Sequence, residues 1–326
     1  MPPASLRCAR ISRTTERMDT VIGAGADETQ GAVQFERLAV LGCGLIGGSF
    51  ALAARRANLA KHIVGYSKSP STTRLALRRG VIDEEADSAL RAVSGADLVV
   101  LAVPVVSTAD LLKQIRHGVE SHALIMDVGS TKANVAHAAA AQLGSRQSQF
   151  VPCHPIAGKE KSGVQFAEAG LFDGRRVVVT PLAANSSDLV DIAIQVWEGI
   201  GGIVSVMAPE EHDAAFAAVS HLPHLLAFAY VYALSSQPQG SAYLQLAGPG
   251  FRDFSRIAGG DPHMWRDILQ ANRDEVLRQL QLYKQALAGF EAQARQGNWT
   301  AVEALIRRAS QIRHGWAAPT QADDET

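Results

Sequence analysis

The segment RLAVLGCGLIGGSFALA, residues 37–53, constrains the fold of this chain more than any other. An apolar strand pattern runs into glycines and opens a helix. Such a helix start offers free N–H groups and a partial positive charge to an anion. We expect Gly42 to make the tight turn, Gly44 to let the backbone approach a pyrophosphate, and Gly47 to allow close helix–strand packing. In this context the spacing predicts a dinucleotide site, with Leu45 and Ile46 within it.

Strand and helix patterns alternate as far as residue 207. We expect strands at 37–44, 62–67, 96–105, 123–130, 149–155, 175–181 and 202–207. Helical patterns follow several of these runs, and the third run is almost continuous in valine and leucine, as a strand buried on both faces should be. The alternation predicts an α/β fold with a Rossmann-type, doubly wound and mostly parallel sheet.

Only helical patterns are found beyond Pro209. We therefore expect a dinucleotide-binding domain at 35–207 and an all-α domain at 208–316. A disordered tail at 1–34 and a polar tail at 317–326 would flank them. A long helix is expected to kink at Pro223. Its apolar run, residues 222–234, is too short to span a membrane, so we expect it to be a buried helix.

The charge balance argues against two classes of partner. The net charge is −1 and the sequence pI is near 6.8, whereas nucleic-acid binders and membrane-surface proteins usually carry a basic excess. Three widely spaced cysteines match neither a disulfide framework nor a zinc site, which is typical of a reducing compartment. No secretory signal is evident at residues 1–34. We expect a cytoplasmic protein.

The end of the second strand bears on the choice of dinucleotide. NAD sites usually place an acid there, bonded to the ribose 2′-hydroxyl. Here no acid occurs at all from residue 38 to residue 82. The hydroxyls and the cation that would suit a 2′-phosphate are Ser67, Lys68, Ser71 and Thr72. The pattern favours NADP over NAD, although a solvated loop would look the same. After the third strand, Val103 and Pro104 would hold the chain close to the nicotinamide.

Polar residues also follow the next two strands. The loop DVGSTK brings Asp127, Ser130 and Lys132, and HPIAGKEKSG brings His154 between two prolines. Carboxyl ends of strands are where ligands bind in open α/β sheets. A histidine that merely caps a strand end is the alternative for His154 alone.

Two pairs stand out in the helical part. His221 and His224 lie three residues apart, and nearby His212 and Asp213 offer no recognised metal-ligand spacing, so we expect no metal site. Arg252 and Arg256 lie four apart in an apolar, glycine-rich segment. A solvated face is one interpretation. The other is that at least one arginine is held inward as a carboxylate clamp.

Taken together, LGCGLIGGSFA, LAVPV, DVGSTK, HPIAGKEKSG, SHLPH and GFRDFSRIAGGDPHMWRDI resemble the prephenate and arogenate dehydrogenase family of tyrosine biosynthesis. The motifs occur in the family's order and cover about residues 37–290. The resemblance implies a dinucleotide-binding domain followed by a helical substrate domain that dimerises, hence a homodimer. It also implies oxidation of a cyclohexadienol ring, with hydride transfer to NADP or NAD.

The resemblance assigns roles to single residues. His154 and Ser130 would share the substrate's ring hydroxyl, and Arg256 would bind a substrate carboxylate. The resemblance also places around the same pocket Arg252, His221, His224, Glu160 and Trp265. Neutral His154 suits a general base near neutral pH. As it takes the hydroxyl proton, a hydride leaves the ring, carbon dioxide is lost and the ring becomes aromatic.

Three alternatives remain at this point. Prephenate is favoured as the substrate, but arogenate or both are open. A β-hydroxyacid dehydrogenase would use a lysine such as Lys132, yet it has no place for the His154 loop or the Arg256 segment. A dinucleotide-sensing regulator without chemistry is the third, and the joint presence of His154, Ser130 and Arg256 argues against it.

Overall fold

The structure is a computed structural model that describes residues 33–159 and 161–316. The expected polar tail at 317–326 and Glu160 lie outside the described residues, and so does almost all of the expected tail at 1–34.

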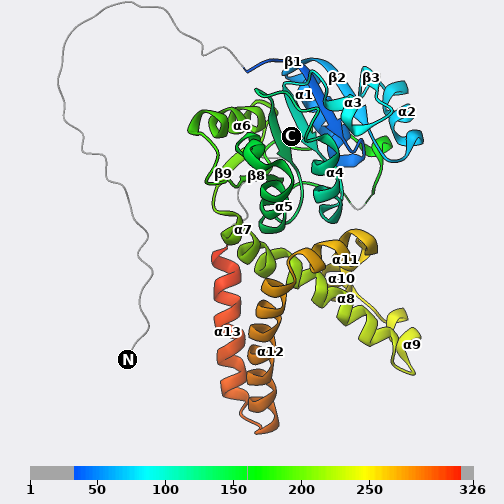
Figure 1. Cartoon of the computed structure of the whole chain (residues 1–326). Helices are drawn as coiled ribbons and strands as arrows, with labels where there is room; N and C mark the ends of the chain where they lie inside the picture. The colour runs from blue at the N-terminus through cyan, green and yellow to red at the C-terminus, as the bar shows by residue number, and fades with distance from the viewer. Residues whose placement is uncertain (1–32, 160, 317–326) are drawn as a thin grey trace, which may run out of the picture. The chain divides into compact units, whose positions relative to one another are not determined.

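Six strands form one parallel sheet in the order β3-β2-β1-β4-β5-β6 (Figure 1). The register pairs Leu41 with Leu101 and Leu101 with Asp127, so β1, β4 and β5 end at the same edge. The order reverses between β1 and β4, which makes their carboxyl ends the switch point where ligands bind in such sheets. The predicted doubly wound sheet is confirmed. The strands are β1 (Phe35–Leu41), β2 (Ala60–Tyr66), β3 (Glu84–Glu85), β4 (Leu98–Leu101), β5 (Leu124–Asp127) and β6 (Phe150–Val151).

Helices cover both faces of this sheet, and each face has its own core. Along β1, Leu38 and Val40 pack to one side while Ala39 and Leu41 pack to the other. Because both sets are fully buried, the strand patterns are continuous rather than alternating. The first side is covered by α1 (Leu45–Arg56), α2 (Pro70–Arg78) and α6 (Ser187–Gly199), and the second by α3 (Ala89–Val93), α4 (Thr108–Ile115) and α5 (Ala133–Leu143).

The last expected strands lie mostly outside the large sheet. The run expected at 149–155 breaks at Pro152 into β6 and a separate strand, β7 (Cys153–Pro155). Proline cannot donate to a ladder, so the chain changes sheets there. β7 pairs antiparallel with β8 (Arg176–Val179), and β8 pairs parallel with β9 (Ile203–Val206). His154 therefore lies within a strand, opposite Val178, and not in a loop after one.

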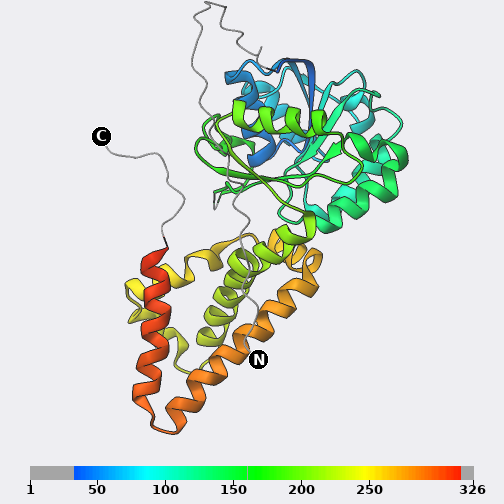
Figure 2. The ribbon, with the colours of Figure 1, turned by 90° about the vertical axis from the view of Figure 1, so that its left-hand side faces the viewer.

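The helical part begins at α7 (Pro209–Phe216) and continues without a break into a π-helical turn, Ala217–His221, and α8 (Leu222–Ser235). The expected irregularity at Pro223 takes this form because proline lacks an N–H and crowds the carbonyl of the preceding turn. α12 and α13 then form a helical hairpin, whose two arms spread apart from the turn that joins them (Figure 2). The remaining helices are α9 (Gly240–Gln245), α10 (Pro249–Ser255), α11 (Pro262–Ala271), α12 (Arg273–Arg295) and α13 (Trp299–Gly315).

Helix α8 is not the buried helix that its sequence predicts. Only Leu222 and Ala227 are buried, and Tyr232 is 75% exposed. In the described part of the chain, the elements that pack against α8 leave most of its residues partly or fully exposed. By length and composition, the continuous helix Pro209–Ser235 could cross a membrane, a weak criterion that core helices of other proteins also meet.

Candidate active site

The glycine-rich turn lies at the switch point and has room for a dinucleotide. Gly42 has a φ of +105°, and a Cβ there would come within 2.1 Å of the Ala102 oxygen. A Cβ on Gly47 would come within 2.0 Å of the Gly42 oxygen. A Cβ on Gly44 would meet nothing within 4 Å, and Gly44 has no side chain to cap α1. The α1 N-terminus is thus open to an anion while the other two glycines are required by packing, which fits a pyrophosphate.

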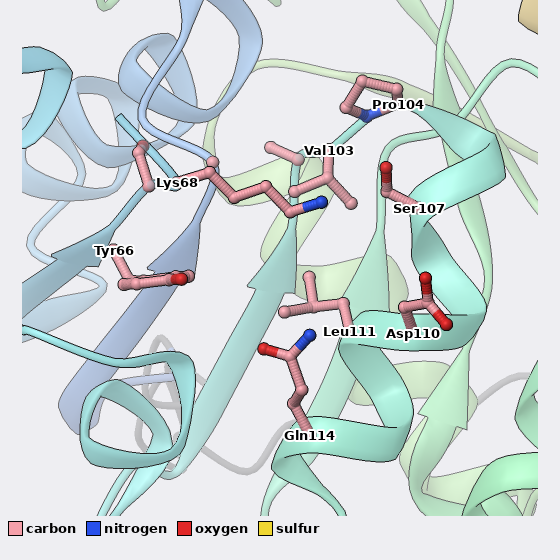
Figure 3. Close-up of a pocket in the computed structure, with 11 residues that line it drawn as sticks. Tyr66, Lys68, Val103, Pro104, Ser107, Asp110, Leu111 and Gln114 are labelled. Carbon is pink, nitrogen blue, oxygen red and sulfur yellow. The ribbon is translucent and has the colours of Figure 1, made fainter. Parts of the chain in front are cut away.

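A pocket of about 180 Å³ lies beside this turn, between the end of β2 and helix α4 (Figure 3). Its surface is mostly apolar, which suits a flat heteroaromatic ring. In Figure 3 the Lys68 side chain extends across the pocket toward Val103 and Ser107. The residues around the pocket are Gly42, Tyr66, Ser67, Lys68, Ala102, Val103, Pro104, Ser107, Asp110, Leu111 and Gln114.

The four residues expected at a 2′-phosphate divide into two groups. Ser67 and Lys68 line the pocket, and the Ser67 hydroxyl accepts a hydrogen bond from the Cys43 N–H at 2.9 Å. This bond ties the end of β2 to the glycine-rich turn. Ser71 and Thr72 do not line the pocket, and the Ser71 hydroxyl lies 2.8 Å from that of Ser69.

His154 is buried at one end of a hydrogen-bonded chain of side chains. Its Nδ1 lies 2.8 Å from Nε2 of His212, and Nδ1 of His212 lies 2.8 Å from Oδ1 of Asp213. The ring of Phe216 stacks on His212 with centroids 4.4 Å apart and also flanks His154. Burial holds the pKa of His154 well below 6.5, and nearby His212 and Lys132 lower it further. Burial also lowers the pKa of His212, although Asp213 opposes the shift.

Asp213 reaches across from the helical part to the start of α5. Its Oδ1 accepts from the Lys132 N–H at 2.7 Å, and its Oδ2 accepts from the Ala133 N–H at 2.9 Å. The first residues of α5 have no side-chain cap of their own. A carboxylate in this place satisfies free N–H groups and complements the helix dipole. Asp213 therefore both caps α5 and orients His212.

A buried ion pair braces the strand ends beneath His154. The ammonium of Lys132, fully buried, lies 2.5 Å from Oδ2 of Asp127 and donates to the Cys153 carbonyl at 2.7 Å. Asp127 Oδ1 accepts from the Cys153 N–H. Lys132 thus joins β5 to β7 and presents no amine to a substrate.

A second cluster holds three residues expected in the pocket, with Asn272 beside them. The rings of His224 and Trp265 stack with centroids 3.6 Å apart, and His221 approaches Trp265 edge-on at 6.3 Å. Nδ1 of His221 lies 3.1 Å from Nδ2 of Asn272. Burial lowers the pKa of His221 to about 4, and the backbone of Ser130 is among the groups that oppose this shift.

The two arginines expected at the substrate lie at the surface of the single chain. Both Arg252 and Arg256 are exposed there, and the expected carboxylate clamp stays a prediction. They lie on α10 and directly after it, and α10 buries no residue of its own. Arg256 is close enough to His224 to lower that histidine's pKa, a smaller effect than burial. Arg252 pairs with Asp253.

Sequence reasoning missed several residues of this arrangement. His212 and Asp213 were considered only as metal ligands, and in the described part of the chain no group of three or more His, Cys, Asp or Glu side chains could hold a metal. Because His212 lies 58 residues after His154, only the folded chain shows their contact. Adjacent His and Asp at the start of an apolar helix was the one available signal. Phe216 and Asn272 gave none.

The family is visible in two adjacent matches. Residues 50–206 match the model of the prephenate dehydrogenase nucleotide-binding domain, and residues 208–308 match that of the prephenate dehydrogenase dimerization domain. The prephenate dehydrogenase of Bacillus subtilis strain 168 is 39% identical over 244 residues, which cover 74% of this chain and 66% of that enzyme. The chain thus spans just under two thirds of that relative.

Comparison with solved structures points to the same family as the sequence matches. The prephenate dehydrogenase of Aquifex aeolicus, in complex with hydroxyphenyl propionate and NAD⁺, superposes with a TM-score of 0.81 at 32% identity, covering 87% of this chain and 99% of that one. Synechocystis arogenate dehydrogenase gives a TM-score of 0.75 at 27% identity, covering 86% of this chain and all of that one (100%). The two family models together match well over half of the chain. The expected resemblance is confirmed: the chain belongs to the prephenate dehydrogenase family, oxidoreductases that join a nucleotide-binding domain to a helical dimerisation domain.

Proposed function

We propose that this protein oxidises prephenate to 4-hydroxyphenylpyruvate and carbon dioxide, with His154 as the general base. The observation that carries the proposal is the buried chain His154–His212–Asp213. A carboxylate only accepts hydrogen bonds, so Nδ1 of His212 must donate to Asp213. Neutral His212 then accepts at Nε2, and His154 must donate to it from Nδ1. Nε2 of His154 is left as the acceptor, which is the state a base requires.

The three hydrogen-bonded side chains also accommodate the proton after its transfer. When His154 takes the proton of the ring hydroxyl, the new positive charge can be shared with His212, beside the Asp213 carboxylate. In other enzymes a third residue orients the catalytic histidine in the same way. The nicotinamide, when bound, accepts the hydride. Loss of carbon dioxide then makes the ring aromatic, so the protein mainly has to orient the substrate.

We assign the remaining site residues on the family resemblance together with their placement. Ser130 shares the ring hydroxyl with His154, and Arg256 binds a substrate carboxylate. The cluster around Trp265 supports the assignment, since Arg256 lies near His224. Secondary roles around the substrate are proposed for Arg252, His221, His224, Trp265 and Glu160, the last of which lies outside the described residues.

For the cofactor we propose NADP, with NAD as the alternative. Ser67 and Lys68 line the pocket at the end of β2, where an acid would favour NAD. The pyrophosphate would lie at Gly42, Gly44 and Gly47, with Leu45 and Ile46 in the first turn of α1. Val103 and Pro104, at the end of β4, would face the nicotinamide side. NAD⁺ is the cofactor in the Aquifex aeolicus complex, which keeps NAD as the alternative.

The same proposal covers assembly and location. We propose a homodimer through the helical domain, with domains at 35–207 and 208–316, in the cytoplasm. The match to a dimerization domain and the exposed apolar residues of α8 support the dimer. Cys43 and Cys153 are free and buried, which is compatible with a reducing compartment.

Two competing activities can be distinguished from the proposed oxidation of prephenate. A β-hydroxyacid dehydrogenase would need a free lysine, whereas Lys132 is buried against Asp127. Arogenate differs from prephenate by an ammonium in place of a keto group, and the solved arogenate dehydrogenase keeps that substrate as the second candidate.

The test is the initial rate of nicotinamide reduction with prephenate or arogenate and with NAD or NADP. We expect the fastest turnover with prephenate and NADP. His154→Asn should lower kcat by roughly 10²- to 10⁴-fold, the usual contribution of a general base. A near wild-type rate in that variant would show that His154 is not the base. Absence of turnover in all four combinations, with cofactor still bound, would refute the proposed reaction.

A further inference from the structure

A single continuous helix carries residues of both clusters of the candidate site. α7 holds His212, α8 holds His224, and the π-helical turn Ala217–His221 joins the two helices. At the end of this turn the N–H of Leu222 donates to the carbonyl of Ala217, five residues earlier instead of four. The π turn therefore takes up one residue more than a turn of α-helix. Such turns are rare and occur frequently at functional sites.

The extra residue determines which side chains share a face of this helix. At about 100° per residue, a regular α-helix would place His224 about 120° around the axis from His212. It would place His221 about 80° from Asp213. With one residue taken up by the π turn, both angles fall to about 20°. The histidines at the end of the turn and beyond it are thus aligned with the two residues before it.

The contacts along this face agree with the angles. Nδ2 of Asn272 lies 2.8 Å from the carbonyl oxygen of Asp213 and 3.1 Å from Nδ1 of His221. One side chain thus reaches a residue before the turn and the residue that ends it. Beyond the turn, the ring of His224 stacks on that of Trp265 with centroids 3.6 Å apart. The helix therefore brings the two clusters to the same side.

The sequence favours a π turn at this place. Pro223 has no N–H, so a regular helix would lack its hydrogen bond to the Val219 carbonyl, and its advantage over a wider turn is reduced. The carbonyl of Ser220 can only accept, so Nδ1 of His224 donates to it, at 2.9 Å. The ring of His224 is therefore fixed to the turn itself.

We propose that the π turn is a positioning element for the reaction: its extra residue turns His221 and His224 to the side of the helix on which His212 lies. The proposal rests on the proposed function, in which His154 bonds the substrate hydroxyl and the two later histidines lie around the same substrate. Without the extra residue, one helix would not present both groups to one substrate. The number of residues in the turn, and not their side chains, is what matters.

Deletion of Val219 in the full-length protein tests this number directly. Val219 is 71% exposed, so its loss removes no buried side chain. The helix can then continue as a regular α-helix, and His221 and His224 turn by about 100° away from His212. With prephenate and NADP, kcat should fall and KM should rise, which lowers kcat/KM roughly 100-fold or more, as misplacement at a site does. The Kd for NADP should not change, because the residues that line the nucleotide pocket precede the turn.

Val219→Ala is the matched control, since it truncates the same side chain and keeps the number of residues. It should leave kcat and the KM for prephenate unchanged. Insertion of one alanine after Val219 is the second variant, for the case in which the deletion does not fold. It turns the same histidines the other way and should cause a similar loss. Far-UV circular dichroism shows whether each variant has kept its helices.

The proposal is overturned if the shortened or lengthened turn keeps the wild-type kcat/KM. It is also overturned if only kcat falls, since a smaller fraction of folded enzyme lowers kcat and leaves KM unchanged. An equal loss in Val219→Ala would assign the effect to the side chain and refute the proposal. A wild-type crystal structure in which the Leu222 N–H bonds to the carbonyl of Ala218 would do the same without any variant. A wild type inactive toward prephenate and arogenate would instead refute the proposed function.

Discussion

At the residue scale, the carboxylate of Asp213 determines, in the proposed mechanism, which nitrogen of His154 accepts the substrate's proton. It accepts hydrogen bonds from His212, Lys132 and Ala133 and gives none. An asparagine there keeps the shape but brings an NH₂ group that must face one of these donors. If the NH₂ turns to His212, the imidazole proton moves to Nε2 and the lone pair on His154 Nε2 is lost.

Asp213→Asn should therefore lower kcat by on the order of 10²-fold or more, as the wrong tautomer does in other histidine-dependent enzymes. The capping of α5 is also weakened, so the stability should fall by about 1 kcal/mol. Stopped-flow hydride transfer measures the first effect and thermal unfolding the second. Asp274→Asn is the control, since Asp274 is exposed on α12. Hydride transfer at the wild-type rate in Asp213→Asn would contradict the proton arrangement that we assign.

His221 links the same network to pH. Its pKa is about 4 in the folded chain against 6.5 for an ordinary histidine. The unfolded chain therefore binds more protons in this interval. The contribution of neutral His221 to the free energy of unfolding is complete above pH 6.5. It is lost as the pH falls toward 4, by up to about 3 kcal/mol.

Urea unfolding of the wild type and of His221→Gln at both ends of this interval checks the expectation. The loss of stability on acidification should be clearly smaller in His221→Gln. Replacement of the exposed His117 should not reduce it. An equal loss in all three proteins would mean that His221 titrates normally.

At the scale of elements, we expect the end of β2 to set the cofactor preference. Ser67→Asp places an acid beside a ribose 2′-position while still accepting from the Cys43 N–H. The KM for NADP should rise by roughly tenfold or more, because like charges brought together in a site cost several kcal/mol, and the KM for NAD should fall.

Ser71→Ala is the matched control, because the Ser71 hydroxyl is bonded to Ser69 and lies away from the pocket. It should change neither KM. The ratio of the two KM values, measured at saturating prephenate, gives the answer. An unchanged ratio in Ser67→Asp would place the 2′-position elsewhere.

Elements also show how far the sequence could be interpreted. The strand, glycine turn and first helix were predictable, since local sterics at Gly42 and Gly47 demand them. The break at Pro152 was not, because a proline after a strand run looks the same whether the chain stops or enters a second sheet. The proposed catalytic chain of hydrogen-bonded side chains was only half predictable. His154 was singled out from its local sequence, whereas His212 and Asp213 approach it through tertiary contacts.

At the scale of the whole molecule, the helical part of the single chain exposes large apolar side chains to solvent. Tyr232 is 75% exposed and Leu246 84%. Patches of this kind mark interfaces. Light scattering should give about twice the chain mass of 34.7 kDa, and Tm should rise with protein concentration, because association stabilises the folded state.

Tyr232→Asp should weaken the dimer, since it buries a charge if α8 lies in the interface. Leu90→Asp is the control, because Leu90 is exposed on α3, in the nucleotide-binding part. A wild-type protein that stays monomeric at every concentration would argue against the proposed dimer.

The cap that Asp213 places on α5 has a consequence for protein engineering. Chain recombination between family members treats the two domains as exchangeable modules, cut near residue 207. That cut would take the helix start, with Lys132 and Ala133, from one parent and its carboxylate from the other. It would also take His154 and its hydrogen-bond partner His212 from different parents. Chimeras should therefore take α7 and α5 from the same parent. The residues that must stay together thus lie on both sides of the domain boundary.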